Sequence, residues 1–202
     1  MVQGGEVVYA GFWKRFAAYV IDGFVVGIVT IAVQMAVALG MFGAVGAVSN
    51  PETMFRSATG IVALLLIYLI PLAFQAVYYA WFHASASQAT LGKMAVGIKV
   101  VRENGEPVSF ALGIGRYFAM LLSSITLLIG FVMAGFTDRK RALHDMVCST
   151  LVVDRWAYTA HPERQRHELG GVALAVIILG VVLCVGYVGV VGVIAAMAGR
   201  GG

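Results

Sequence analysis

The chain has 202 residues, of which 60% are hydrophobic and only 12% are charged. Because soluble domains carry about 25% charged residues, this composition argues against a soluble enzyme and indicates a membrane protein. The net charge of +4 comes from scattered Lys and Arg residues without an RNA or DNA motif, so we expect basic loops and no nucleic-acid partner.

The first apolar segment runs from Phe16 to Gly40 and is long enough to cross the bilayer as a helix. Asp22 interrupts it, about 9–10 Å inside the helix when counted from Phe16. Its length and this carboxylate argue against a cleaved signal peptide, so residues 1–15 are predicted to be a cytoplasmic N-terminus. A charge at this depth costs roughly 2.5–3.5 kcal/mol, which marks Asp22 as part of an ion pair or a functional site.

The second apolar segment runs from Ile61 to Phe82 and is predicted to return across the bilayer. Helical spacing places one polar stripe on each of these two helices, at matching depth near their cytoplasmic ends. We therefore expect a single buried polar pocket in which Asp22 meets Gln75. The two stripes are Arg15, Tyr19 and Asp22 on the first helix, and Gln75, Tyr79 and His83 on the second.

The third apolar segment, Tyr117 to Phe136, is long enough to span, but the distribution of charge favours a different topology. If all four apolar segments cross, the 14 Lys and Arg residues divide equally between the two sides. If this segment enters and returns on one side, twelve of them lie inside, as the positive-inside rule expects. We therefore predict a helical hairpin or re-entrant segment over Phe110 to Phe136, with a break near Ser123-Ser124.

Two short stretches on either side of this segment have strand character. Residues 97–110 (GIKVVRENGEPVSF) predict a β-hairpin with Asn104-Gly105 as its turn, and Ser149 to Asp154 predict another strand. The two stretches are able to pair only if both flanks of the third segment lie on the same side. The predicted fold is an all-α membrane protein: three spanning helices plus a re-entrant or hairpin helical segment, with a small cytoplasmic β element.

The C-terminal part of the chain is predicted to add one more spanning helix. Residues 155–168 are polar and predict a cytoplasmic linker, and residues 169–202 contain the last apolar segment, from Leu169 to Gly199. Between the third segment and this linker lie His144 and Asp145, in a short amphipathic run at the membrane surface. Arg15 and Arg116 are the candidate basic partners of Asp145.

These residues complete a resemblance to a known family. The stretches AGFWKRFAAYVID, TLGKMAVGIKVVRENGEPVSFALGIGRYF and RKRALHDMVCSTLVV resemble the RDD family of small bacterial integral membrane proteins, over roughly Tyr9 to Asp154. The family is named for one arginine and two aspartates, which here match Arg15, Asp22 and Asp145. The resemblance implies a membrane domain over residues 16–154 in the bacterial plasma membrane. It links some members to monovalent cation/proton antiport and others to accessory roles in membrane complexes.

Two functions are therefore expected from the sequence. In the first, Asp22 binds a proton or Na⁺, which is exchanged as Arg15 moves between carboxylates. In the second, the Arg/Asp cluster is a structural ion-pair network in a non-transporting accessory or scaffold protein. The candidate ion- or proton-binding residues are Asp22, Arg15, Asp145, Gln75, Tyr79 and Tyr19, with Arg116, His144 and His83 in support.

The sequence offers no sign of an enzyme. It contains no phosphate-binding Gly-rich loop, no HExxH motif and no evident nucleophile-base pair, and we expect neither a cofactor nor a metal. The expected partners are the lipid bilayer and, for a transporter, monovalent cations and protons. Three or four membrane segments barely enclose a path, so a transporter is expected to be a homo-oligomer. An accessory protein is expected to be either monomeric or bound to a larger membrane protein.

Overall fold

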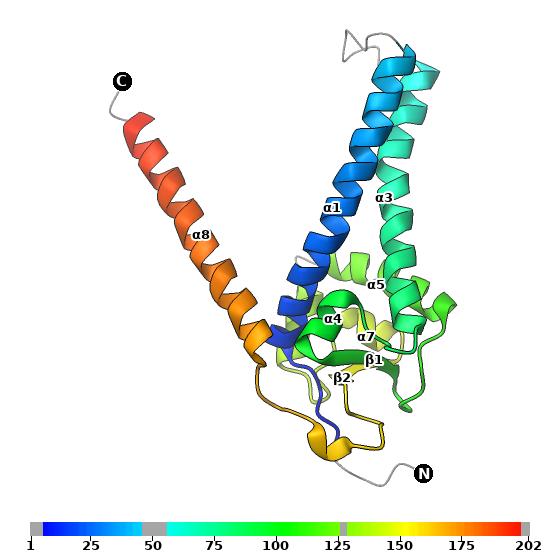
Figure 1. Ribbon diagram of the computed structural model, residues 1–202, viewed down its shortest axis with the longest axis vertical. Helices are drawn as coiled ribbons and strands as arrows, with labels where there is room; N and C mark the ends of the chain where they lie inside the picture. The colour runs from blue at the N-terminus through cyan, green and yellow to red at the C-terminus, as the bar shows by residue number, and fades with distance from the viewer. Residues whose placement is uncertain (1–5, 46–55, 126–128, 199–202) are drawn as a thin grey trace.

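A computed structural model gives the fold, and the structure describes residues 6–45, 56–125 and 129–198. Residues 1–5 of the predicted N-terminal segment and residues 199–202 of the predicted C-terminal segment lie outside the described residues. The described chain is mostly helical, with one small sheet (Figure 1).

Three long helices dominate the structure. They are α1 (Phe12–Val45), α3 (Ala58–Ala84) and α8 (Gly171–Ala198). Each contains a segment long and apolar enough to cross a membrane, so the predicted membrane fold with three spanning helices is confirmed. Helix α1 begins four residues before the predicted Phe16, because Lys14 and Arg15 lie in its first turn and are buried against the rest of the chain.

Helices α1 and α3 lie side by side, whereas α8 diverges from them after its first turns (Figure 1). Ala173 in the first turn of α8 is fully buried, but Val182, Val185 and Tyr187 further along are each at least 60% exposed. An apolar helix with this exposure needs hydrocarbon around it, since its side chains have no other apolar surface to cover.

The sheet lies at the end of the helix pair where α1 begins and α3 ends, which we call the sheet end (Figure 1). Its two strands, β1 (Ile98–Arg102) and β2 (Thr150–Asp154), are antiparallel, and Val100 pairs with Val152. The pairing between these two stretches agrees with the sequence prediction. Two short helices accompany them, α4 (Leu91–Val96) and α7 (Leu143–Val147).

The β-hairpin predicted over residues 97–110 forms its first strand and its turn but not its second strand. The turn itself forms, because the N–H of Gly105 donates to the carbonyl of Arg102 at 2.9 Å and Gly105 adopts a φ of +84°. The N–H of Arg102 also donates to the carbonyl of Glu106 at 2.9 Å. The chain then leaves the ladder at Pro107, which has no N–H to donate, and β1 takes β2 as its partner strand instead.

The third apolar segment folds as α5 (Phe110–Ile125), α6 (Ile129–Val132) and the 3₁₀ turn η1 (Met133–Gly135), with a bend of 113° between its two parts. Because β1 precedes this segment and β2 follows it, the sheet brings both of its flanks to the sheet end. Helix α5 continues through the predicted break, where the Ser123 and Ser124 hydroxyls donate to the carbonyls one turn earlier at 3.1 and 3.2 Å. Residues 126–128 lie outside the described residues.

Helix α5 is amphipathic and packs closely on α3. Its buried residues recur at helical spacing, and they include Gly113, Arg116 and Tyr117. A Cβ added at Gly113 would lie 2.8 Å from the Cα of Ala80, so this glycine sets the distance between the two helices. The same face of α5 contacts α7, where Arg116 pairs with Asp145.

The predicted linker, residues 155–168, contains one 3₁₀ turn, η2 (Pro162–Arg164). Trp156 lies between the Arg155 and Arg164 guanidinium groups, each 5.1 Å from its ring centroid. The Gln165 side chain accepts a hydrogen bond of 2.9 Å from the N–H of Val8. The linker is therefore folded against the N-terminal residues rather than extended away from them.

Candidate functional site

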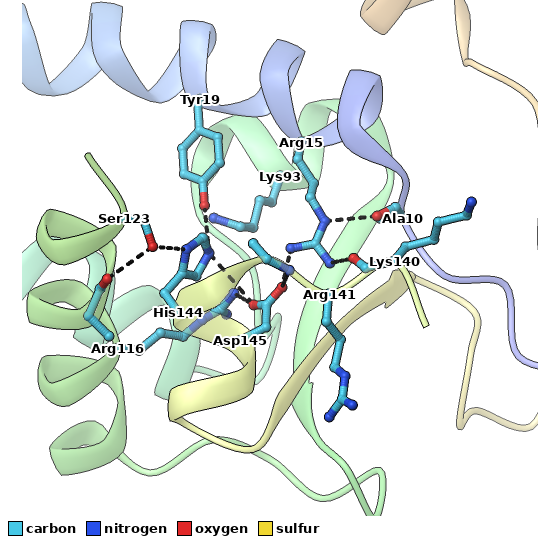
Figure 2. A network of polar contacts seen from close by, with 12 residues as sticks. Ala10, Arg15, Tyr19, Lys93, Arg116, Ser123, Lys140, Arg141, His144 and Asp145 are labelled. Atoms are coloured by element: carbon cyan, nitrogen blue, oxygen red, sulfur yellow. Dashed lines mark hydrogen bonds and ion pairs between the residues drawn. The ribbon is translucent and has the colours of Figure 1, made fainter. Parts of the chain in front are cut away.

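Asp145, on α7, is the centre of a buried ion-pair network at the sheet end (Figure 2). Its carboxylate is inaccessible to solvent, and its two oxygens form separate ion pairs with Arg15 and Arg116. The N–H of Ala142 donates a further hydrogen bond of 3.0 Å. Burial alone would raise the pKa of Asp145, but the two guanidinium groups outweigh it and hold the pKa below its usual value. Both partners are those that the sequence suggested.

Arg15 is held at all three of its guanidinium nitrogens (Figure 2). Nε donates to the carbonyl of Ala10 at 2.8 Å, Nη2 donates to the carbonyl of Lys140 at 2.5 Å, and Nη1 pairs with Asp145. Within the described residues Arg15 makes no hydrogen bond or ion pair to Asp22. Of the two carboxylates, Arg15 thus pairs here with Asp145, and its expected movement between them stays a prediction.

Asp22 forms a second polar centre, separate from Asp145. It is completely buried and accepts three hydrogen bonds, from the hydroxyl of Tyr78 at 3.0 Å, the hydroxyl of Thr90 at 2.6 Å and the N–H of Gly92 at 2.7 Å. A Cβ at Gly92 would lie 2.9 Å from the Cγ of Asp22, so only glycine lets α4 approach this closely.

Gln75 does not face Asp22, so the predicted contact between them is wrong. The α3 residue that reaches the carboxylate is Tyr78, three positions further along the helix. Gln75 instead lies toward α5, where its Oε1 accepts a hydrogen bond of 3.5 Å from the hydroxyl of Tyr117. The prediction gave the correct pair of helices but the wrong face of α3.

Tyr79 and His83 also lie on the side of α3 that meets α5. The Tyr79 ring stacks on Tyr117 with 5.9 Å between centroids, and its centroid is 6.0 Å from that of His83. His83 is 4% exposed, and neither ring nitrogen has a hydrogen-bond partner among the described residues. His83 is therefore a buried residue at the end of α3.

Lys93, on α4, extends toward the ring of Tyr19 (Figure 2). Its ammonium nitrogen is 5.0 Å from the Tyr19 ring centroid and 5.5 Å from that of Tyr79, which are cation–π distances. It also lies 3.5 Å from the Thr90 hydroxyl, which donates to Asp22, so Thr90 links the ammonium to the carboxylate. Burial lowers the pKa of Lys93 to about 7, although the nearby Asp22 carboxylate opposes this shift.

A chain of hydrogen bonds joins Tyr19 to Ser123 through His144 (Figure 2). Burial lowers the pKa of His144 to about 3, so the imidazole is neutral at physiological pH. Ser123 donates to the carbonyl of Ala119 at 3.1 Å, and its hydroxyl oxygen lies 3.3 Å from Nδ1 of His144. Nε2 of His144 lies 3.3 Å from the Tyr19 hydroxyl and 3.7 Å from a carboxylate oxygen of Asp145.

The charges of the whole site balance only when Lys93 is neutral. Arg15, Arg116 and Lys93 supply three buried positive charges, while Asp22 and Asp145 supply two negative ones. Releasing a proton from Lys93 removes the excess.

Sequence reasoning gave no role at this site to several residues that form it. Lys93 was counted only among the basic residues that set the topology. Thr90 and Gly92 were named only as part of the stretch that resembles the family. The available signal was a threonine that begins a helix, two residues before a glycine and three before a lysine. The residues in question are Tyr78, Thr90, Gly92, Lys93 and, as a partner of His144, Ser123.

Comparisons with known proteins agree with the membrane architecture. A model of the RDD family matches residues 9–149. The chain is 42% identical over 149 residues to "Uncharacterized protein YxaI" of Bacillus subtilis (strain 168), which covers 71% of this chain and 96% of that protein. It is 29% identical over 159 residues to "Uncharacterized membrane protein YteJ" of the same bacterium, which covers 74% of this chain and 84% of that protein. No solved structure gives a significant match. Helix α8 lies outside the residues that match the family model.

Proposed function

Because the chain belongs to the RDD family and is a multi-pass membrane protein, we propose that it exchanges monovalent cations such as Na⁺ for protons across the bilayer. The observation that carries this proposal is the pairing of Asp22 with Lys93 through the Thr90 hydroxyl, in a site without access to solvent. A buried carboxylate beside an ammonium group that is able to lose its proton is the chemistry that such exchange needs.

The cation would bind where oxygen atoms converge. The hydroxyl oxygens of Thr90 and Tyr78 lie 2.6 and 3.0 Å from the Asp22 carboxylate, and hard cations prefer oxygen ligands. When Lys93 is protonated, its ammonium holds the positive charge next to this carboxylate. When Lys93 is neutral, a cation takes over that charge, so the two compete for one position.

Replacing Asp22 with asparagine is expected to abolish exchange while leaving the fold intact. The amide keeps the shape of the side chain but removes the negative charge that holds the cation, so we expect at least a tenfold loss of rate, about 1.4 kcal/mol or more. The measurement uses purified protein in liposomes, with a pH-sensitive dye inside and Na⁺, Li⁺ or K⁺ added outside. The melting temperature in detergent reports the fold.

A suitable control is Asp138→Asn, which removes the same charge from an exposed residue. If the wild-type protein shows no cation-dependent proton flux with any of the three cations, the transport proposal is rejected. Because a single chain offers few helices to enclose a path, we expect the transporting unit to be a homo-oligomer, which cross-linking in the membrane would detect.

A second function remains open because of the Asp145 centre. The ion pairs of Asp145 with Arg15 and Arg116, together with the hydrogen bond from the Ala142 N–H, join α1, α5 and α7 into a fixed unit. Such a unit suits a scaffold or accessory protein as well as a transporter. In that case a larger membrane protein is expected to co-purify in mild detergent, and liposomes that contain this chain alone would show no flux.

We further propose that the chain lies in the bacterial plasma membrane with its sheet end in the cytoplasm. Twelve of the 14 Lys and Arg residues belong to the segments around the sheet end, and cytoplasmic segments collect such residues. Reporter proteins fused after Ala160 and after Gly202 are expected to give cytoplasmic and periplasmic signals respectively. A periplasmic signal at Ala160 would reverse this orientation.

A further inference from the structure

A pocket of about 550 Å³ opens at the sheet end between the start of α1, the turn η1 and the start of α8. Two of the membrane-spanning segments begin beside it, at Phe12 and at Gly171. The pocket therefore lies at the depth where lipid headgroups meet the hydrocarbon core. Its volume is within the range of small-molecule sites, about 300–1,000 Å³.

The apolar part of the pocket is suited to the upper part of an acyl chain. Trp13 is 53% exposed, Phe136 is 85% exposed and Leu169 is 41% exposed, and all three line the pocket. Tryptophan at the end of a spanning helix is typical of the membrane interface. These side chains need an apolar neighbour, because no other described part of the chain covers them.

The polar part of the pocket is basic. Among the described residues, the titratable side chains that line it are Lys14, Lys140 and His167, and no carboxylate joins them. The neighbouring pocket, on the other side of Lys14, has Asp154 and Glu168 in its lining as well as basic residues. The charge pattern thus selects an anion in the first pocket and not in the second.

Both lysines are fixed in place. The Lys14 ammonium donates to the carbonyl of Arg166 at 2.6 Å and keeps two further N–H donors. The Lys140 carbonyl accepts from Arg15, and its ammonium lies 3.4 Å from the carbonyl of Gly135. The lysine side chains are therefore already ordered, so binding an anionic headgroup would cost little additional side-chain conformational entropy.

From this combination of basic and aromatic lining at the level of the headgroups, we propose that the pocket binds an anionic phospholipid. The phosphodiester lies against Lys140 and Lys14, and the upper acyl chain lies along Trp13 and Phe136. Because His167 and Leu169 lie outside the residues that match the family model, the C-terminal extension completes the site. The bound lipid would join the base of α8 to α1.

The test measures lipid retention by the purified full chain. Protein is incubated with phosphatidylglycerol or with phosphatidylcholine of the same acyl chains, and bound lipid is counted by native mass spectrometry. We expect retention of phosphatidylglycerol and a higher melting temperature with it than with phosphatidylcholine. Lys140→Gln is expected to weaken phosphatidylglycerol binding about fivefold, which is the usual effect of one basic residue at an anionic membrane surface.

Two variants keep the test decisive. Arg164→Gln removes the same charge from the exposed linker and is expected to leave lipid retention unchanged. Lys140→Arg keeps the positive charge and is expected to retain the lipid, even if Lys140→Gln proves too unstable to purify. The proposal is overturned if the wild-type protein retains the two lipids equally. It is also overturned if Lys140→Arg, Lys140→Gln and Lys14→Gln retain the same amount of lipid and none of them prefers the anionic lipid. Equal stabilisation by inorganic phosphate alone would overturn it as well, because the site would then be one for a free anion.

Discussion

Replacing Asp145 with alanine is expected to destabilise the protein more than any other single change at the site. The substitution leaves Arg15 and Arg116 buried, at 4% and 2% exposure, without their shared counter-charge. Removing one partner from a buried ion pair costs about 3–5 kcal/mol, which is a large share of the stability of a small domain. We expect little protein in the membrane fraction and a much lower melting temperature in detergent.

The control for this prediction separates loss of charge from loss of the network. Asp138→Ala removes a carboxylate from an exposed position and is expected to change the melting temperature little. A triple variant that converts Asp145 to leucine and both arginines to methionine removes the buried charges together, and it is expected to recover much of the lost stability. If Asp145→Ala melts at the same temperature as Asp138→Ala, the network does not hold the sheet end to the bundle.

The spanning helices and the strand pairing were predictable because the membrane imposes strong constraints on sequence. Hydrocarbon tolerates few charges, so an apolar run such as Ile61 to Phe82 marks a helix with little ambiguity. The positions of Lys and Arg then limited the topology of the third segment, and this placed β1 and β2 at one end before any contact was known.

The contacts within the site were harder to predict because, apart from Gln75, Tyr79 and His83 near its end, α3 carries apolar residues on all sides. In a soluble helix the apolar stripe shows which face is buried, but α3 has no such stripe, so its sequence does not fix its rotation. Gln75 and Tyr78 both lie near the depth of Asp22, and packing against α5 decides between them: Gly113 admits Ala80 and turns Tyr78 toward Asp22. The rotation of α3 is thus a tertiary property.

Lys93 was hidden for a related reason. Insertion scales give lysine a high cost inside a membrane-spanning helix, so a lysine is expected in a loop. Because Lys93 follows α3, it was predicted to be one of the basic residues of a cytoplasmic loop. Its burial depends on Gly92, which lets α4 reach Asp22, and on the Tyr19 and Tyr79 rings, which come from two other helices. No pattern within one segment indicates an arrangement that three segments build together.

Under the proposed exchange, Lys93 is expected to set the pH dependence of cation binding. Below its pKa of about 7 the ammonium is charged and competes with the cation at Asp22, whereas above that pH it is neutral and the site is free to accept the cation. The apparent cation affinity should therefore rise about tenfold per pH unit up to pH 7 and level off above it. Equilibrium binding of radioactive sodium across this pH range measures the effect.

Two substitutions at Lys93 should separate competition from simple loss of structure. Lys93→Met removes the competitor, so sodium binding is expected to persist with a weaker dependence on pH, while proton-coupled flux in liposomes stops. Lys93→Arg keeps a permanent positive charge, because guanidinium does not lose its proton in proteins, and it is expected to exclude sodium at every pH. The matched control is Lys99→Met, which removes another buried lysine, on β1. If Lys93→Met retains the wild-type pH profile, the proton that is exchanged for the cation is carried elsewhere and Lys93 has only a packing role.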